Sequence, residues 1–398
     1  MTQPALSLLS GTRILSFTQF LVGPAAVQYL SDMGADVVKV EPPGTGAWER
    51  TWSGADTFLN GTSAFYLLAH RNVRSVTLDL KHPDAREVAH RLLRTADVLV
   101  ENFRPGVMER LGLDYDAVRK VNPGIVYASA TGYGEDSPYR DLPGQDLIVQ
   151  ALSGLASVTG RSGDLPTPAG AAVVDQHCAA LLALGILGAL YHRARTGEGQ
   201  RLHVSLLEAA VDLETEPLVY HLNGSVVQRP SGGLGSSFHP APYGTYRTSD
   251  GYLVLSFTPV KVLSEALGNP PELQPYEDPA LTTSKREEIW RVLASIFPER
   301  TTDEWVALLR EHGAWCAPVS FYPQVVEDPA FKHLDPVLEM DHPDAGRVRV
   351  LRHPVRYGSG VPEVRRLPPG LGADTDEVLS ELGFSEEQVA RLRADGVV

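Results

Sequence analysis

The sequence predicts an α/β fold, in which short buried strands alternate with helices along the first part of the chain. Three observations support this prediction. Apolar β-rich runs recur through the first 130 residues, helical patterns separate them, and a small mixed unit follows a later stretch rich in Gly, Pro and Ser. Strands and helices that alternate in this way form a parallel sheet covered by helices.

The first strand, helix and second strand are expected within residues 12–40. TRILSF at 12–17 has the composition of a strand, and Pro24 suits the first turn of a helix because its φ is fixed. That helix is expected to stop at Gly34, and DVVKV at 36–40 forms the next strand.

The same alternation continues with a helix that begins near Pro83 and with strands at 97–101 and 124–130. The result is a Rossmann-like arrangement. Its first strand leads into SFTQF at 16–20, however, where a dinucleotide-binding fold has the turn G-x-G-x-x-G. The missing cradle for the pyrophosphate argues against a nicotinamide-dependent dehydrogenase.

A long helix is expected at 171–195, because this stretch is rich in helix formers and is apolar on nearly all sides, which indicates burial. A strand at 201–205 and a helix at 206–214 follow. The Gly/Pro/Ser-rich stretch at 229–242 has the composition of a linker or mobile loop.

A small α+β unit is expected beyond this stretch. It consists of a hairpin around the Ser-Asp-Gly turn at 249–251 and of helices at 284–296 and 302–311. From about residue 325 short strand patterns return, with RVRVL at 347–351, which suits either a split large domain or a third domain.

Composition limits the classes of ligand. A hydrophobic fraction of 43% and 21% charged residues indicate an ordinary globular protein. The formal charge of −14 argues against general binding to nucleic acid or anionic lipid, so a polyanionic ligand needs a local basic pocket.

Neither export nor membrane insertion is expected. The N-terminus lacks a basic flank with a long apolar run, and no segment offers about 18 uninterrupted apolar residues. Cys178 and Cys316 lie far apart, without the spacing of a disulfide framework or zinc site. We therefore expect a cytoplasmic protein.

Asp175 is the candidate catalytic residue, since it lies near the start of the long apolar helix, after Gly170-Ala171-Ala172-Val173-Val174. Backbone N–H groups at a helix start can hold a carboxylate ionised and can stabilise an oxyanion during acyl transfer. An aspartate at this place is also a common N-cap, and the residue alone does not decide between the two roles.

The surrounding motifs resemble those of CaiB/BaiF proteins, the family III coenzyme A transferases. The resemblance spans almost the whole chain. The matching segments are Phe17-Thr18, Gly23-Pro24-Ala25, 34–42 (GADVVKVEP), 74–81 (RSVTLDLK), 97–106 (DVLVENFRPG), 132–134 (GYG), 170–175, 195–200 (RTGEGQ), 232–235 (GGLG), 315–319 (WCAPV), 374–379 (DTDEVL) and 396–398 (GVV).

This resemblance implies a CoA-transferase that moves CoA from an acyl-CoA donor to a carboxylic acid. Asp175 takes the role of the family's catalytic aspartate, which forms anhydride and aspartyl-CoA thioester intermediates, and neither a metal nor a redox cofactor is needed. The resemblance implies CoA contacts at Phe20, Leu21, Leu78, Lys81, Asn102, Phe103, Arg104 and Arg110. Positive side chains among these suit the CoA phosphates.

The resemblance also implies an intertwined homodimer and a large domain built from both chain ends. The expected domains are 1–225 for the first part of the CoA-binding domain, 226–325 for the small domain, and 326–398 for the return to the large one. Within the small domain, Gly232, Gly233 and Gly235 are expected to form a substrate loop that covers the site and excludes water. A simple interdomain linker is the alternative interpretation of this loop.

Three positions depart from the family pattern. Pro42 follows the second strand where many members have a basic residue, so a phosphate contact is in doubt. Leu21 stands where formyl-CoA transferases have Gln, which puts small oxalate-like substrates in doubt. Gln145 stands where the racemases of this fold have a proton-transferring His, and an amide cannot perform acid–base catalysis.

Two alternatives therefore remain beside the transferase. One is a 2-methylacyl-CoA racemase or isomerase of the same fold, which would exchange the proton at Cα with solvent. The other is a CoA-binding protein without catalytic activity, which would never carry CoA covalently. The identities of the acyl donor and acceptor depend on the shape of the pocket.

Overall fold

The computed structural model describes residues 4–398. Met1–Gln3 lie outside the described residues, so the first residues of the expected large domain are not covered. The chain forms two compact units. The first takes the chain up to Val149, Ala172–Ala210 and Asp335–Val398, and the second takes Gln150–Ala171 and Val211–Leu334.

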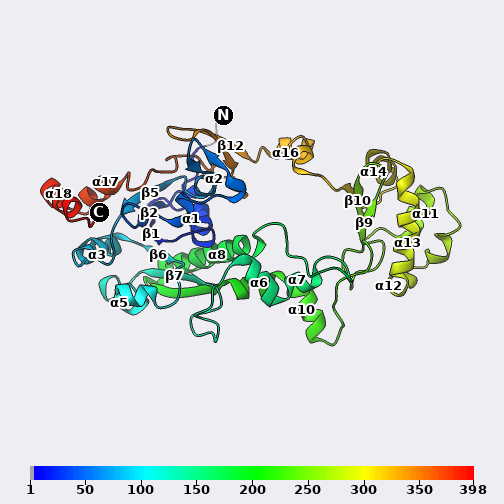
Figure 1. Ribbon diagram of the computed structural model, residues 1–398, viewed down its shortest axis with the longest axis horizontal. Coiled ribbons are helices and arrows are strands. Elements are labelled where there is room, and N and C mark those ends of the chain that lie inside the picture. The colour runs from blue at the N-terminus through cyan, green and yellow to red at the C-terminus, as the bar shows by residue number, and fades with distance from the viewer. Residues whose placement is uncertain (1–3) are drawn as a thin grey trace. The chain divides into compact units, whose positions relative to one another are not determined.

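The first unit is built on a parallel sheet of six strands, in the order β5-β2-β1-β6-β7-β8 (Figure 1). The strands are β1 (Arg13–Phe17), β2 (Asp36–Glu41), β5 (Val73–Thr77), β6 (Val98–Glu101), β7 (Val126–Thr131) and β8 (Gln200–Ser205). The predicted α/β class and its Rossmann-like sheet are confirmed. Strand β5 was not predicted, because its sequence, VRSVT, mixes apolar residues with Arg74 and Ser75.

Helices cover both faces of this sheet. The helices of the first unit are α1 (Val22–Asp32), α2 (Ala64–Leu67), α3 (Ala85–Thr95), α4 (Val107–Leu111), α5 (Tyr115–Val121), α8 (Val173–Thr196), α17 (Thr375–Glu381) and α18 (Glu386–Ala394). Alternate strand residues such as Leu15, Val38 and Leu99 form one buried core with α3, α5, α17 and α18. Burial on both faces explains why the strands are almost continuously apolar.

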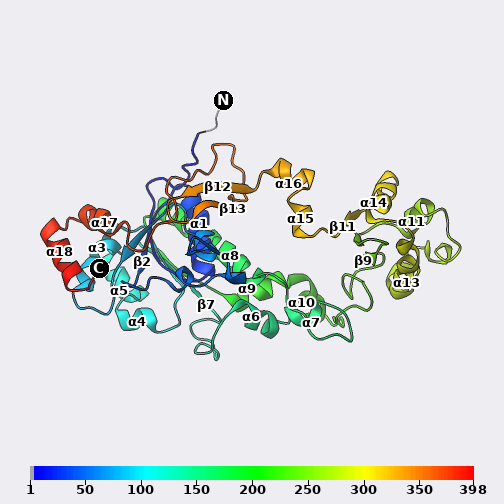
Figure 2. The same cartoon turned by 45° about the horizontal axis from the view of Figure 1, so that its top comes forward.

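Helix α8 is the long apolar helix that the sequence predicts. It packs against α1, β7 and β8, and its side chains Val174, Leu182 and Ile186 are fully buried. By length and composition it could cross a membrane, and it is the one helix of residues 4–398 that could. Its position beside α1, visible in Figures 1 and 2, is that of a core helix.

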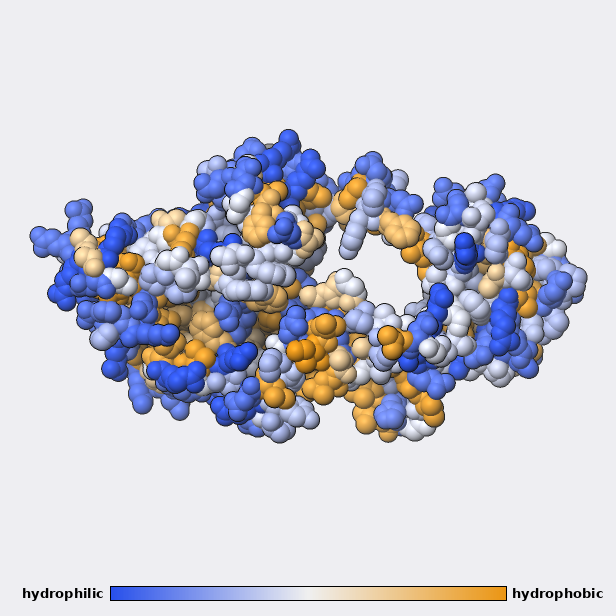
Figure 3. Space-filling model, viewed as in Figure 1, coloured by the Kyte–Doolittle hydropathy of each residue, from blue (hydrophilic) through white to orange (hydrophobic). Residues whose placement is uncertain are grey.

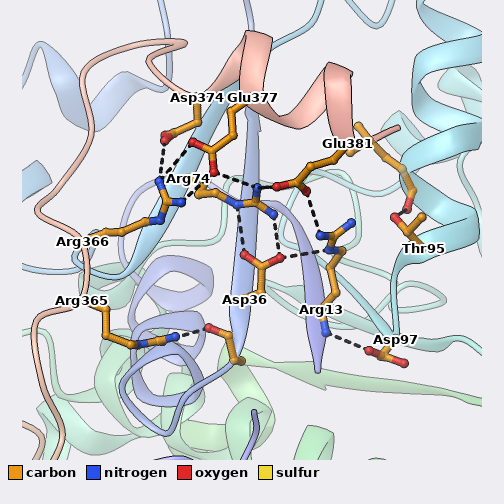
Figure 4. A network of polar contacts seen from close by, with 12 residues as sticks. Arg13, Asp36, Arg74, Thr95, Asp97, Arg365, Arg366, Asp374, Glu377 and Glu381 are labelled. Atoms are coloured by element: carbon orange, nitrogen blue, oxygen red, sulfur yellow. Dashed lines mark hydrogen bonds and ion pairs between the residues drawn. The ribbon is translucent and has the colours of Figure 1, made fainter. Parts of the chain in front are cut away.

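The last part of the chain returns to the first unit beside β5. Arg74 of β5 is only 3% exposed and donates to Asp36 of β2 at 2.6 Å and to Glu381 of α17 at 2.7 Å. Arg366 reaches Asp374 and Glu377 in the same network (Figure 4). These contacts hold α17 against the edge of the sheet.

Two small antiparallel pairs complete the first unit. They are β3 (Phe58–Leu59) with β4 (Thr62–Ser63), and β12 (Val337–His342) with β13 (Gly346–Leu351). Short 3₁₀ turns lie at η1 (Trp48–Arg50) and η2 (Gly54–Asp56). The hairpin of β12 and β13 contains the strand predicted at 347–351 and packs Met340 and Val348 against Leu67 of α2.

The second unit has a three-stranded antiparallel sheet in the order β11-β10-β9. The strands are β9 (Gly244–Arg247), β10 (Tyr252–Leu255) and β11 (Cys316–Pro318). The helices are α7 (Leu155–Val158), α10 (Thr215–Leu222), α11 (Val260–Ala266), α12 (Leu281–Ser284), α13 (Arg286–Ile296), α14 (Thr302–Glu311), α15 (Tyr322–Val325) and α16 (Pro329–Leu334), with 3₁₀ turns η3 (Gln274–Tyr276) and η4 (Phe297–Glu299). The predicted hairpin and its two helices are present.

The borders of the units differ from the expected domains at three places. Helices α6 (Asp146–Ser153) and α9 (Leu206–Leu213) pass from one unit to the other. Residues 150–171, 211–225 and 326–334, expected in the large domain, group with the second unit. Hydrogen bonds join these segments to the same unit, among them Ser162 N to Pro230 O at 2.8 Å.

Candidate active site

A cavity of about 440 Å³ lies in the first unit, at the carboxyl ends of β1, β6 and β7. The chain adds β2 and β5 on one side of β1 and then returns to add β6 on the other side. Ligands of open α/β sheets bind at such a point, where the strand order reverses. The cavity therefore occupies the place where this fold is expected to bind its ligand.

Six of the nine residues predicted for catalysis or CoA binding line this cavity. They are Phe20, Leu21, Asn102, Phe103, Arg104 and Asp175. The turn after β1 supplies the first two, the loop after β6 supplies the next three, and α8 supplies the aspartate. Segments that are about 70 to 150 residues apart in sequence thus meet in one cavity.

The other three predicted CoA contacts do not line the cavity. Leu78 is 1% exposed, and its side chain is part of the core under α17 and α18. Lys81 is exposed on the turn after β5, and its N–H donates to Asp79 at 3.0 Å. Arg110 lies in α4, beside Gly106. Contacts of these residues with CoA remain a prediction.

Asp175 is 3% exposed and lies in the first turn of α8. It is not the N-cap, a position that Ala172 occupies, so the interpretation of Asp175 as a capping residue is wrong. The N–H groups of Val174 and Asp175 donate instead to the carboxylate of Asp146 on α6, at 2.9 and 3.0 Å. Asp146 thus takes the capping role.

The electrostatic surroundings of Asp175 differ from the expectation that N–H groups keep it ionised. Burial and, to a smaller extent, the nearby negative charge of Asp146 together raise the pKa of Asp175 to about 7. Within residues 4–398, no Lys or Arg forms an ion pair with Asp175. An ionised Asp175 is therefore poorly stabilised, a state that favours attack on an electrophilic carbonyl carbon.

Leu21 and Val22, at the start of α1, line the cavity and have free backbone donors. The N–H groups of Leu21 and Val22 have no hydrogen-bond acceptor among the described residues, as expected for a first helical turn. The dipole of α1 adds positive potential at this end. These donors can stabilise an oxyanion that develops in the cavity.

The turn that leads into α1 has a strained backbone. Phe20 has a φ of 65°, in the left-handed region that residues with a Cβ seldom adopt. Such a residue costs about 1–3 kcal/mol and persists only where its surroundings hold it. Asn102 holds the preceding residue with two bonds of 2.8 Å to Gln19, one to its N–H and one to its carbonyl oxygen.

Two glycines on the cavity wall leave no room for side chains. A Cβ on Gly132 would lie 2.7 Å from the Cα of Gly144, and a Cβ on Gly144 would lie 2.5 Å from the Cα of Gly132. The two backbones, from the loop after β7 and the loop before α6, therefore touch. This contact explains why both motifs carry glycine, and it positions Asp146 next to α8.

Two guanidinium groups contribute positive charge to the cavity wall, Arg104 after β6 and Arg140 in the loop before α6. They provide the local basic character that an acidic protein needs to bind an anion.

The residues that depart from the family pattern fall into two groups. Leu21 and Gln145 both line the cavity, so their side chains can affect which acyl groups fit. Pro42 and Pro43 instead form a turn, in which their carbonyls accept from Gly46 and Thr45, and neither lines the cavity.

The glycines at 232–235 belong to the second unit, and close packing explains why these positions carry no side chain. A Cβ on Gly232 or Gly233 would lie within 2.9 Å of the ring of Trp290, and one on Gly235 would lie 2.5 Å from Tyr243. Gly233 and Gly235 also bond to Thr245 and Tyr243. These glycines permit close packing against β9, and their contribution to substrate binding stays a prediction.

Three important residues were not predicted as site residues. Asp146 caps the helix of Asp175, Arg140 lines the cavity, and Glu49 accepts from the N–H of Phe20 at 2.9 Å. Asp146 and Arg140 lie close to Gly144 in sequence, and this proximity could have identified them as site residues. Nothing in the local sequence marks Glu49, because its partner is 29 residues away.

Residues 4–398 contain no group of three or more His, Cys, Asp or Glu side chains arranged to hold a metal ion.

Comparison with known proteins gives a consistent picture. The family model described as "CoA-transferase family III" matches residues 9–375. An acyl-CoA transferase of Fusarium pseudograminearum is 36% identical, with 98% of this chain and 88% of the relative aligned. Succinyl-CoA:glutarate CoA-transferase of Mus musculus is 34% identical, with coverage of 98% and 90%.

The structural comparison agrees. The crystal structure of a CaiB/BaiF family protein from Brucella suis superimposes with a TM-score of 0.81 at 30% identity, covering 94% of this chain and 99% of that one. The full-length matches, the shared fold and the cavity at the switch point of the sheet lead to one conclusion: the chain belongs to CoA-transferase family III and is a CoA-transferase.

Proposed function

We propose that Asp175 carries the acyl group and then CoA during transfer. The carboxylate attacks the thioester carbonyl of the donor acyl-CoA, so that a C–O bond forms, the C–S bond breaks, and CoA thiolate is released into the site. The thiolate then attacks the carbonyl carbon of the aspartyl group. The donor acid leaves as a carboxylate, and an aspartyl-CoA thioester remains.

The second half of the reaction reverses these steps with the acceptor. The acceptor carboxylate attacks the aspartyl thioester and displaces CoA thiolate, which gives a second mixed anhydride. The thiolate then attacks the acyl carbonyl of this anhydride, which forms the new acyl-CoA and restores the carboxylate of Asp175. These reaction steps consume neither water nor an oxidant, so the reaction balances with the two substrates alone.

The observation that carries this proposal is a buried carboxylate without a cation partner, located in a cavity lined by free backbone N–H groups. A carboxylate that is poorly stabilised as an anion is a good nucleophile toward a thioester. The N–H groups of Leu21 and Val22 supply an oxyanion site for the tetrahedral intermediates. Arg104 and Arg140 supply charge for the anionic parts of CoA or of the acids.

Succinyl-CoA and glutarate are the first substrate pair to test, because a relative of 34% identity is named for them. Both acids carry a distal carboxylate. The guanidinium of Arg140 on the cavity wall is suited to such a group.

We also propose a homodimer. Large apolar side chains are exposed on α6, namely Leu147, Ile148 and Leu152, and on α10, namely Val219, Tyr220 and Leu222. Figure 3 shows apolar surface over α6 and over α10. Exposed apolar groups of this kind mark surfaces that a partner covers.

The test is to mix the protein with succinyl-CoA and to measure its intact mass, followed by peptide mapping. We expect a mass gain equal to a covalently bound CoA on the peptide that contains Asp175. In Asp175→Ala the adduct is expected to be absent, and transfer to fall by at least about 10³-fold, since loss of a nucleophile can cost on the order of 10⁶-fold.

Asp303→Ala is the matched control, because Asp303 also lies in the first turn of a helix but is exposed in the second unit. It is expected to load normally. No adduct with any acyl-CoA, or full activity of Asp175→Ala, contradicts the proposal. Solvent deuterium at Cα of a 2-methylacyl-CoA would instead establish the racemase.

A further inference from the structure

The bent turn before α1 is held from behind by a buried ion pair. Glu49 accepts the N–H of Phe20, the residue with positive φ, through one carboxylate oxygen at 2.9 Å. Its other oxygen accepts from the ammonium of Lys39 at 2.9 Å. Lys39 also donates to the carbonyl of Thr18 at 2.7 Å. One ion pair thus holds both ends of the turn.

This ion pair is shielded from both solvent and ligand. Lys39 and Glu49 are 1% and 0% exposed, and neither is among the described residues that line the cavity. Lys39 comes from the central part of the sheet, on β2, and Glu49 comes from η1. Two residues from separate elements therefore meet on the turn, and neither of these two residues lines the cavity.

The turn itself has little freedom on its other sides. A Cβ on Gly23 would lie 2.5 Å from the side chain of Thr18, so α1 and the turn are in close contact. The ring of Phe20 packs against those of Trp48, Trp52 and Phe65, with centroids 5.1 to 5.8 Å apart. Any change in the backbone at Phe20 must therefore move the first turn of α1.

We infer that the Lys39–Glu49 ion pair is the positioning element of the transfer site. It fixes the left-handed bend at Phe20, and this bend directs the N–H groups of Leu21 and Val22 into the cavity that contains Asp175. The inference rests on the proposed function, because it assigns these N–H groups to the stabilisation of the reacting oxyanion. Lys39 and Glu49 act only through the backbone.

The inference predicts a defect in rate. If the bend relaxes, the two donors move away from the oxyanion, while the apolar and cationic walls that bind CoA remain. A displacement of about 1 Å of a catalytic group can cost on the order of 10²-fold. The turnover number should therefore fall much more than KM rises.

The variant that tests this inference is Lys39→Met/Glu49→Leu. It removes both hydrogen bonds to the turn without leaving an unpaired buried charge, and apolar replacement of a buried ion pair is often neutral for stability. The matched control is Glu41→Leu/Arg50→Met. The side chain of Glu41 is fully buried and that of Arg50 is 13% exposed, with 2.7 Å between them. Glu41 lies two residues from Lys39 on the same strand, but the bonds of this pair do not reach the turn.

Two measurements are made on both variants. The first is hydrogen exchange of peptides that cover 16–22, where we expect the amide of Phe20 to exchange at least tenfold faster in Lys39→Met/Glu49→Leu and unchanged in the control. The second is the turnover rate divided by the fraction of chains that can be loaded with CoA. We expect about a 10²-fold loss in the test variant and less than a twofold loss in the control.

Each contrary result has a distinct meaning. Unchanged exchange at 16–22 overturns the inference, whether or not the protein is active. Faster exchange with unchanged turnover also overturns it, because the bend would then have no effect on catalysis. Equal losses in both variants indicate a general structural effect and overturn it as well. Failure of the wild type to load CoA contradicts the proposed function, which the exchange measurement does not test.

Discussion

The first unit contains buried carboxylates in two regions, and the charged neighbours of these carboxylates have opposite signs. At the start of α8, Asp175 is 3% exposed and has the negative Asp146 as its charged neighbour. At the end of β2, Glu41 is 1% exposed and bonds to the guanidinium of Arg50 at 2.7 Å. Glu49 in the same region pairs with Lys39.

The difference shows that the partner, and not burial itself, decides what a buried carboxylate can do. Burial raises the pKa of Asp175 from 3.8 to about 7, because no cation opposes it. Burial would also raise the pKa of Glu41, but Arg50 and Lys39 lower it from 4.5 to about 2. The paired carboxylate stabilises the fold, whereas the unpaired one is held in a reactive state.

The largest expected effect is the loss of a paired carboxylate. Glu41→Ala leaves Arg50 buried without its partner, which should lower the free energy of unfolding by about 3–5 kcal/mol. Guanidinium denaturation at pH 8 measures this change. A loss below about 1 kcal/mol would show that Arg50 finds another partner, and the comparison would then fail for this region.

The unpaired carboxylate should behave in the opposite way. Asp175→Asn is expected to increase the free energy of unfolding at pH 8 by roughly 2–4 kcal/mol, because the folded state no longer contains a poorly stabilised charge. The folded pKa lies above the unfolded one. The wild type should therefore lose stability relative to the variant as pH rises from about 4 to about 7.

Denaturation curves of the wild type and Asp175→Asn from pH 4 to pH 8 check this prediction. The two proteins should differ least near pH 4, where the folded carboxyl is protonated and the unfolded one is only about half ionised. A variant less stable than the wild type at pH 8 would show that the charge of Asp175 is well stabilised.

The smallest effect concerns the pH dependence of activity. Asp175 must be ionised to act as the proposed nucleophile, so kcat/KM should rise with pH through about 7. Asp146→Asn can still accept the N–H groups of α8 but loses the negative charge, so the rise should move to lower pH. A pH profile that does not shift in Asp146→Asn would show that the charge of Asp146 does not raise the pKa of Asp175.

Local patterns were sufficient to predict most of the first unit. Runs such as RILSF and DVVKV are buried on both faces, so composition alone identifies β1 and β2. β5 was missed because Arg74 and Ser75 are polar residues that distant partners satisfy, and some of those partners, such as Glu381 and Gly372, lie about 300 residues away in sequence. Ion pairs over such distances leave no local signal.

The site, like the fold, could be predicted only in part. Asp175 was identified from its place at the start of an apolar helix, but its environment was not, because Asp146 comes from a different helix. Leu78 shows a second limit of prediction from motifs. The family motif includes it, yet its side chain lies in the core, so a motif can contain structural and ligand-binding residues together.

The return of residues 335–398 to the first unit has a consequence during protein synthesis. The second unit is complete before this segment emerges from the ribosome, and at about 5–20 residues per second the segment takes on the order of 10 s to be made. Until then, Arg74 at the edge of β5 lacks Glu381, and one core face lacks Val378 and Leu379. A chain that ends before this segment therefore has an open core face and an unpaired charge at the edge of the sheet.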